Sequence, residues 1–146
     1  MLMTGSGPID AERAFAREAR ARRRAAMMRR LRRERADFGR LEVLEASRSR
    51  RAAAELARGT REIPLGAIRG TLEPSRATLF DRCFRPASAA RSRWQRVWLA
   101  AQRGNPLPPI AVVPVGDGYA VRDGHHRVSV ARARAALTID AVVDAL

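Results

Sequence analysis

The pattern of apolar residues changes sharply about 60 residues into the chain. Residues 10–58 contain no proline and are rich in the helix formers Ala, Arg, Glu, Leu and Met. Asp10 can cap the start of a helix, and Gly59 can end it. The apolar positions follow one another at steps of four, seven, three and three, on one helical face: Met27, Leu31, Phe38, Leu41 and Leu44. The pattern predicts an Arg-rich extension over residues 1–60 that is helical or partly disordered.

Residues 61–146 instead combine short apolar runs with frequent Pro and Gly. We expect three helical segments, at 65–69, 87–102 and 125–136, and four strands, at 63–65, 110–115, 119–122 and 139–143. Residues 72–76 are expected to form a loop. Residues 116–118 are a hairpin turn, and Pro114 places its strand at a sheet edge or near its own end. This order predicts an α+β domain, a small mixed β-sheet packed with helices.

Aromatic residues are scarce, at 5% of the chain. Trp94 and Trp98 share one face of the predicted helix 87–102 with Ala89, Val97 and Ala101. They can build the core or serve an interface, and the shortage of other aromatic residues favours the core.

The chain is strongly basic, and arginines are concentrated near its N-terminus. All 29 basic residues are Arg, against 15 acidic ones, for a net charge of +14. Arg is suited to bidentate phosphate contacts, although a GC-rich coding sequence also explains the absence of Lys. Eleven Arg lie between residues 13 and 35, so this segment is a solvated helix, a partly disordered arm or a surface that binds nucleic acid. The candidate nucleic-acid contacts are Arg22, Arg23, Arg24, Arg29, Arg30, Arg32 and Arg33.

Several other features of the sequence limit the possible functions. Cys83 is the only cysteine, so no internal disulfide or cysteine metal cluster can form. The longest apolar run near the C-terminus, residues 110–113, is too short to span a bilayer, and the N-terminus lacks the apolar stretch of a signal peptide. We expect a cytoplasmic protein with no membrane partner. The oligomeric state is open, a homodimer included.

The chemical signal lies where the strand 119–122 runs into a helix. Gly124 permits a tight turn, and the first N–H groups of the following helix have no partner inside it. Such a helix start binds anions, and His126 and Arg127 are donors in its first turn. Asp123 can orient a histidine, bind a metal ion carried by a nucleotide, or act as a turn residue. Because neighbouring helical side chains diverge by about 100°, a metal site on His125 and His126 is disfavoured.

At this point the sequence resembles the ParB/sulfiredoxin-like superfamily, over residues 63–143. The matching elements are Ile-Pro-Leu-Gly-Ala-Ile, Glu-Pro-Ser-Arg, Pro-Pro-Ile-Ala-Val-Val and Gly-His-His-Arg. The last box corresponds to Gly-Glu-Arg-Arg in ParB partition proteins and to Gly-Cys-His-Arg in sulfiredoxins. The resemblance implies a ParB/sulfiredoxin-like fold over 61–146 and a nucleotide site. The implied phosphate contacts are Gly124, His125, His126, Arg127 and Arg76.

Two departures narrow what the resemblance implies. His125 occupies the position of the sulfiredoxin cysteine, which argues against sulfinic acid repair. The chain ends at Leu146, soon after the last predicted strand, so we expect no helix-turn-helix domain of the partition proteins.

Three functional hypotheses follow. The first is a regulatory module that binds CTP or ATP, with or without Mg²⁺, and can be associated with DNA. The second is a phosphotransferase or nucleotide hydrolase of the same fold, with Asp123 or Glu73 as base. The third is a non-specific nucleic-acid-binding protein that uses the Arg-rich segment.

Overall fold

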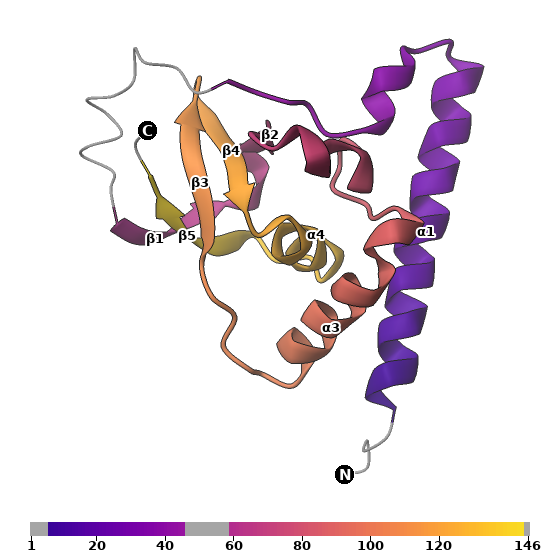
Figure 1. The fold of residues 1–146 in the computed structure, drawn as a ribbon. Coiled ribbons are helices and arrows are strands. Elements are labelled where there is room, and N and C mark those ends of the chain that lie inside the picture. Colours follow the sequence, from indigo (N-terminus) through magenta and orange to yellow (C-terminus); the bar gives the residue numbers. More distant parts are fainter. Residues whose placement is uncertain (1–5, 46–58, 145–146) are drawn as a thin grey trace.

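The computed structural model describes residues 6–45 and 59–144, which form three α-helices and a five-stranded sheet within these ranges (Figure 1). The helices are α1 (Gly7–Leu31), α3 (Arg91–Gln102) and α4 (His125–Ala133). The strands are β1 (Gly59–Pro64), β2 (Ile68–Thr71), β3 (Ile110–Val115), β4 (Gly118–Asp123) and β5 (Thr138–Val143). Short 3-10 turns are η1 (Ala36–Gly39), η3 (Leu65–Ala67), η4 (Pro74–Leu79) and η5 (Ser88–Ala90).

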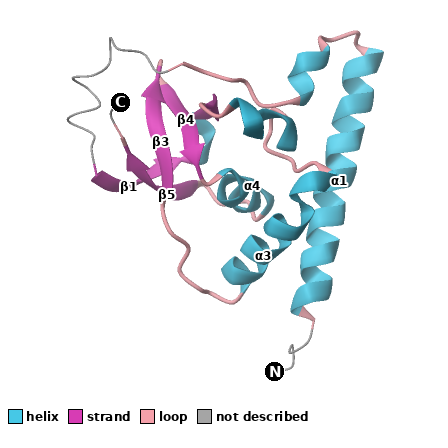
Figure 2. Cartoon of the chain, viewed as in Figure 1, coloured by secondary structure: helices cyan, strands magenta, loops and turns pink. Residues whose placement is uncertain are grey.

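The sheet is mixed, with strand order β1-β5-β3-β4-β2. The β1–β5 and β3–β4 pairs are antiparallel, whereas β3–β5 and β2–β4 are parallel. The helices gather on one side, where α4 lies next to the sheet, α3 packs on α4, and α1 packs on α3 as the outermost layer (Figure 2). The α+β prediction of a small mixed sheet packed with helices and preceded by a long basic helix is confirmed.

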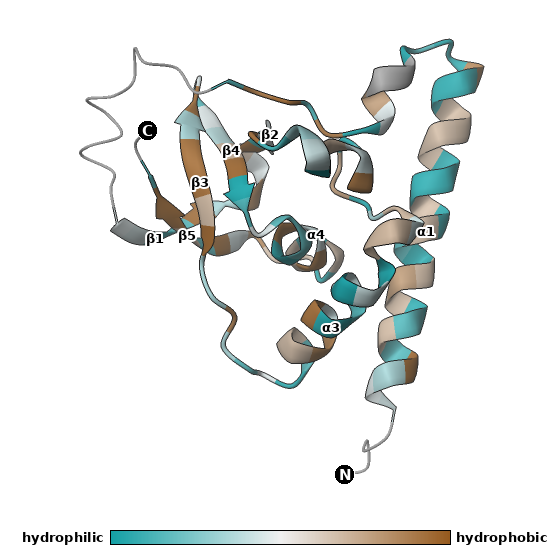
Figure 3. Ribbon diagram, viewed as in Figure 1, coloured by the Kyte–Doolittle hydropathy of each residue, from teal (hydrophilic) through white to brown (hydrophobic). Residues whose placement is uncertain are grey.

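The core has two parts, because the helices bury apolar residues on both sides of α4. Between the sheet and α4, strand residues such as Ile110 and Val121 pack against Val128. On the other side Phe15, Trp94 and Val130 form a smaller cluster between the three helices. Figure 3 shows the contrast between β3, which is mainly hydrophobic, and α1, along which hydrophilic and moderately hydrophobic segments alternate.

Trp94 joins the layers and is completely buried, as its pattern predicted. Its ring meets the Phe15 ring edge-on at a centroid distance of 5.6 Å. Its indole Nε1–H donates to Ser129 Oγ at 2.8 Å, and that hydroxyl donates to the Phe84 carbonyl at 2.5 Å. A buried indole with a satisfied N–H fixes the spacing of α1, α3 and α4.

The prediction of one helix from residue 10 to 58 is wrong. The helix begins at Gly7 and ends at Leu31, after which Arg33 adopts φ +54° and the chain turns back through η1. The predicted apolar face is also wrong, since Met27 and Leu31 are 62% and 72% exposed. A helix gains most of its stability from a packed face, and the buried residues of α1 all lie in its first half. Residues 46–58 of the predicted helix lie outside the described residues.

The buried face of α1 comes earlier in the helix than predicted, at Ala11, Ala14 and Phe15. Of the predicted stripe, Leu41 is buried, but it lies in the extended segment after η1. Small alanines among many arginines gave the true face little contrast in the sequence.

The segment after η1 is attached to β2, a strand that the sequence pattern missed. Thr71 N–H donates to the Glu42 carbonyl at 2.9 Å, and Leu44 N–H donates to the Thr71 carbonyl at 2.8 Å. Gly70 permits this close approach, because a Cβ there would overlap the Glu42 carbonyl. Four residues with an internal Gly give little strand signal, so only pairing with β4 and residues 42–44 reveals β2.

The strand predicted at 63–65 is β1, which begins four residues earlier, at Gly59, and ends at Pro64, so Gly59 starts a strand and does not end a helix. The other elements match their predictions closely, with three adjustments. The helical turn predicted at 65–69 is η3 and ends at Ala67, and the loop predicted at 72–76 leads into η4 from Pro74 onward. Helix α4 ends at Ala133, three residues early, since Ala135 has φ +60°. Pro114 lies near the end of β3, past the residues paired with β5, so its missing N–H breaks no ladder bond there.

Candidate anion-binding site at the start of α4

The turn between β4 and α4 depends on Gly124. Its backbone has φ +104° and ψ +25°, a left-handed conformation that side chains disfavour. A Cβ at this position would lie 2.5 Å from Ile110 Cγ2. The first helical hydrogen bond runs from Val128 N–H to the Gly124 carbonyl at 3.0 Å, so the N–H groups of residues 125–127 have no acceptor within the helix.

His125 faces inward and is 3% exposed. Its Nε2 lies 2.6 Å from Thr71 Oγ1, and its ring stacks on Phe80 at a centroid distance of 6.4 Å. Thr71 Oγ1 also accepts the Glu73 N–H at 2.8 Å. The pair therefore fixes the start of α4 to the end of β2.

His126 lies beside the same phenylalanine, 9% exposed and edge-on to the Phe80 ring at 5.3 Å. Burial lowers the pKa of each histidine to about 4, and nearby positive charge adds to the effect. Arg76 is the leading cation for the pKa of His125, and Arg93 followed by Arg76 for that of His126. Both imidazoles are therefore neutral at pH 7, and each carries one N–H donor.

Two arginines from different elements act on His126 through their charge. Arg76 belongs to η4 and is half-buried, whereas Arg93 belongs to α3 and is exposed. Within residues 6–45 and 59–144, neither guanidinium forms an ion pair with a carboxylate. Arg76 was singled out from the sequence, but Arg93 was not, because nothing distinguishes it from the other arginines of this chain.

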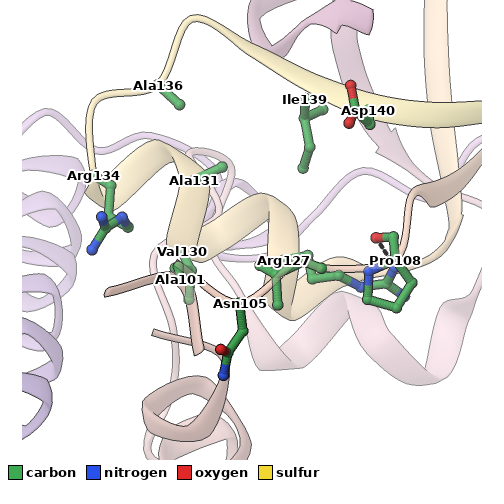
Figure 4. Close-up of a pocket in the computed structure, with 11 residues that line it drawn as sticks. Ala101, Asn105, Pro108, Arg127, Val130, Ala131, Arg134, Ala136, Ile139 and Asp140 are labelled. Atoms are coloured by element: carbon green, nitrogen blue, oxygen red, sulfur yellow. Dashed lines mark hydrogen bonds between the residues drawn. The ribbon is translucent and has the colours of Figure 1, made fainter. Parts of the chain in front are cut away.

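Arg127 points toward the loop that precedes β3 (Figure 4). Its Nη1 donates to the carbonyls of Pro108 and Pro109 at 2.6 and 2.8 Å, and its Nη2 lies 3.2 Å from Asp123 Oδ2. The side chain forms part of the wall of a cavity of about 310 Å³ between α4, β5 and this loop. Arg127 thus holds the loop in place, and most of its donors are engaged.

The two acids named as candidate bases lie at the edges of the site. Asp123 is paired with Arg127, and its side chain is 78% exposed. Glu73 is exposed and is held through its backbone N–H. Among the described residues neither carboxylate hydrogen-bonds to a histidine, and no group of three His, Cys, Asp or Glu side chains could hold a metal ion. Their catalytic role stays a prediction.

The arginines named for nucleic-acid binding separate into two sets. Arg22, Arg23, Arg29 and Arg30 line a cavity at the far end of α1. Arg24, Arg32 and Arg33 are exposed outside it. None of the described helices has the length and apolar character needed to cross a membrane.

The comparisons with known proteins are sparse. No family model matches the sequence, and no curated protein matches it. Among solved structures, sulfiredoxin from Arabidopsis thaliana is similar, with a TM-score of 0.45 and 21% sequence identity. That alignment covers 59% of this chain and 84% of the sulfiredoxin chain.

Proposed function

We propose that the start of α4 binds the phosphate groups of a nucleotide and that the protein is a regulatory nucleotide-binding module. The observation that carries this proposal is the position of Arg76 and Arg93. The charges of both lower the pKa of His126 at the positive end of α4, and among the described residues neither forms an ion pair with a carboxylate. Two unpaired guanidinium groups beside a helix N-terminus favour a ligand with more than one negative charge.

The groups at the site have complementary roles in this proposal. The N–H groups of residues 125–127 and the neutral His126 donate to phosphate oxygens, while Arg76 and Arg93 supply the positive charge. His125 keeps the helix start in position through Thr71, and Arg127 does the same through the Pro108 carbonyl. Gly124 supplies the left-handed backbone conformation from which the helix starts.

The regulatory role follows from where these groups originate. Arg76 comes from η4, Arg93 from α3 and the N–H donors from α4. A nucleotide that contacts η4, α3 and α4 together would make their arrangement more stable than it is without the nucleotide. CTP and ATP are the nucleotides that the sequence resemblance suggests, and Mg²⁺ would reduce the repulsion between their phosphates.

Isothermal titration with CTP and with ATP, with and without Mg²⁺, tests the proposal. An Arg76→Gln/Arg93→Gln variant is expected to bind about 100-fold more weakly, since a hydrogen bond to a charged group contributes about 1.5–3 kcal/mol. The matched control is Arg96→Gln/Arg103→Gln, which removes the same charge from exposed arginines at or just after α3. The proposal is wrong if the parent protein binds neither nucleotide, or if both variants lose equal affinity.

A further inference from the structure

A basic cavity lies between the last turns of α1 and the returning η1 turn. It measures about 300 Å³. Five of its eight lining residues are arginines, and one is acidic: Arg22, Arg23, Ala26, Arg29, Arg30, Glu34, Arg35 and Gly39. Because Glu34 also lies 3.8 Å from Arg32, its charge is shared with an arginine outside the cavity. The cavity therefore has a large excess of positive charge.

The backbone holds these arginines together without a ligand. Glu34 N–H donates to the Arg29 carbonyl at 2.9 Å, and Arg33 N–H donates to the Arg30 carbonyl at 3.1 Å. Gly39 leaves room in front of Arg29, since a Cβ there would lie 3.3 Å from Arg29 Nη2. Keeping like charges close costs free energy, and an anion in the cavity would offset that cost.

Arg22 gives an independent sign of a missing acceptor. Its Nε atom is shielded from solvent and has no hydrogen-bond partner among the described residues. Such orphaned donors are uncommon in folded proteins, because a buried N–H without an acceptor is destabilising. An oxyanion bound in the cavity would supply an acceptor for this donor.

We propose that this cavity binds backbone phosphates of a nucleic acid. The cationic surface continues outside it through Arg24, Arg32 and Arg33, which a single small anion would leave unused. Helix α1 alone carries eight arginines and three acids over 25 residues. At 1.5 Å per residue that helix is about 37 Å long, which is enough to follow several phosphates of a duplex. The contacts are to phosphates, so binding is expected to show little sequence preference.

Fluorescence anisotropy with a labelled 20-base-pair DNA duplex, titrated with the full chain at several salt concentrations, tests this site. An Arg22→Gln/Arg29→Gln variant is expected to lower affinity by at least about tenfold. The slope of log K against log salt should fall by about 1.8, because each lost phosphate contact contributes about 0.9. The matched control, Arg96→Gln/Arg103→Gln, removes the same charge from exposed arginines at or just after α3, outside α1 and the cavity, and should weaken binding much less.

A charge-neutral variant separates the cavity from general electrostatic attraction. Gly39→Leu fills the cavity without altering net charge, and circular dichroism reports whether the fold is kept. It is expected to weaken duplex binding severalfold. Equal losses in the cavity and control variants, or full binding by Gly39→Leu, would overturn the proposal.

Two further arms identify the source of the phosphate. Competition with pyrophosphate at the duplex's own phosphate concentration should displace little of the duplex if the site follows a polymer backbone. Sedimentation with phosphatidylserine vesicles should show weaker binding than the duplex. Complete displacement by pyrophosphate, or preference for the vesicles, would overturn the nucleic-acid assignment. These two results concern the α1 cavity and do not test CTP or ATP binding at α4. The two sites are separated by Arg76→Gln/Arg93→Gln, which should leave duplex binding within about threefold of the parent.

Discussion

The start of α4 and the end of α1 are both cationic, but they are built in different ways. At α4 the donors next to the helix start are neutral histidines buried against Phe80 and Thr71. At α1 the arginines lie at a helix end where Met27 and Leu31 are exposed beside them. The first region therefore depends on the core, whereas the second depends on a local turn of the backbone.

The two regions should therefore respond to different kinds of substitution. A change in the core should disturb α4 and leave the charge of the α1 cavity intact. A change of surface charge should weaken the α1 cavity and leave stability almost unchanged. The following predictions test that separation.

The largest effect is expected from Trp94→Ala. It removes the ring that packs on Phe15 and the indole that donates to Ser129, so it should lower the free energy of unfolding by about 3–5 kcal/mol. Trp94→Phe keeps most of the ring and should cost only about 1–2 kcal/mol, through the lost hydrogen bond and a smaller side chain. Urea unfolding measures both. A loss below about 1 kcal/mol for the alanine variant would contradict the proposed role of Trp94 as the joint between helix layers.

A pH effect should follow from the buried histidine. The pKa of His125 is about 4 in the folded chain, below its ordinary value of 6.5. The unfolded chain therefore binds more protons in that window, and stability is fully present above pH 6.5 and falls as pH drops toward 4. Between pH 7.5 and 4.5 the expected loss from His125 is about 2–3 kcal/mol.

Denaturant unfolding at both pH values, in the parent and in His125→Gln, measures this contribution. The variant should show a smaller drop, and the difference isolates His125 from carboxylates that titrate nearby. An identical pH dependence in both proteins would show that His125 is not held neutral by the fold.

The smallest predicted effect on stability comes from substituting two glycines, Gly124 and Gly39. Gly124→Ala should lower the free energy of unfolding by about 2 kcal/mol, because φ +104° is strained for alanine and Ile110 blocks the new methyl group. Gly39→Ala should change it by no more than about 0.5 kcal/mol, since only the flexible end of Arg29 is near. Thermal and urea unfolding measure both. Equal costs would remove the distinction between a core-dependent and a local site.

Much of the second half of the fold could be predicted from the sequence. The strands β3, β4 and β5 and the helices α3 and α4 each have a local pattern of apolar residues, and all five were predicted. Gly or Pro marks at least one end of each of them except β5. Strand β2 and the end of α1 were not. The first is too short to show a pattern, and the second depends on the absence of a neighbour for Met27 and Leu31.

For the candidate site, the sequence by itself determined the strand, the glycine turn and the helix start, because those follow from local backbone preferences. Only the tertiary structure decided which arginines gather there. Arg127 is next to the turn in sequence, yet it donates to the Pro108 carbonyl. Arg93 lies 33 residues before His126 in the sequence, yet from α3 its charge lowers the pKa of that histidine. Long arginine side chains have many rotamers of similar energy, so packing between distant segments selects their direction.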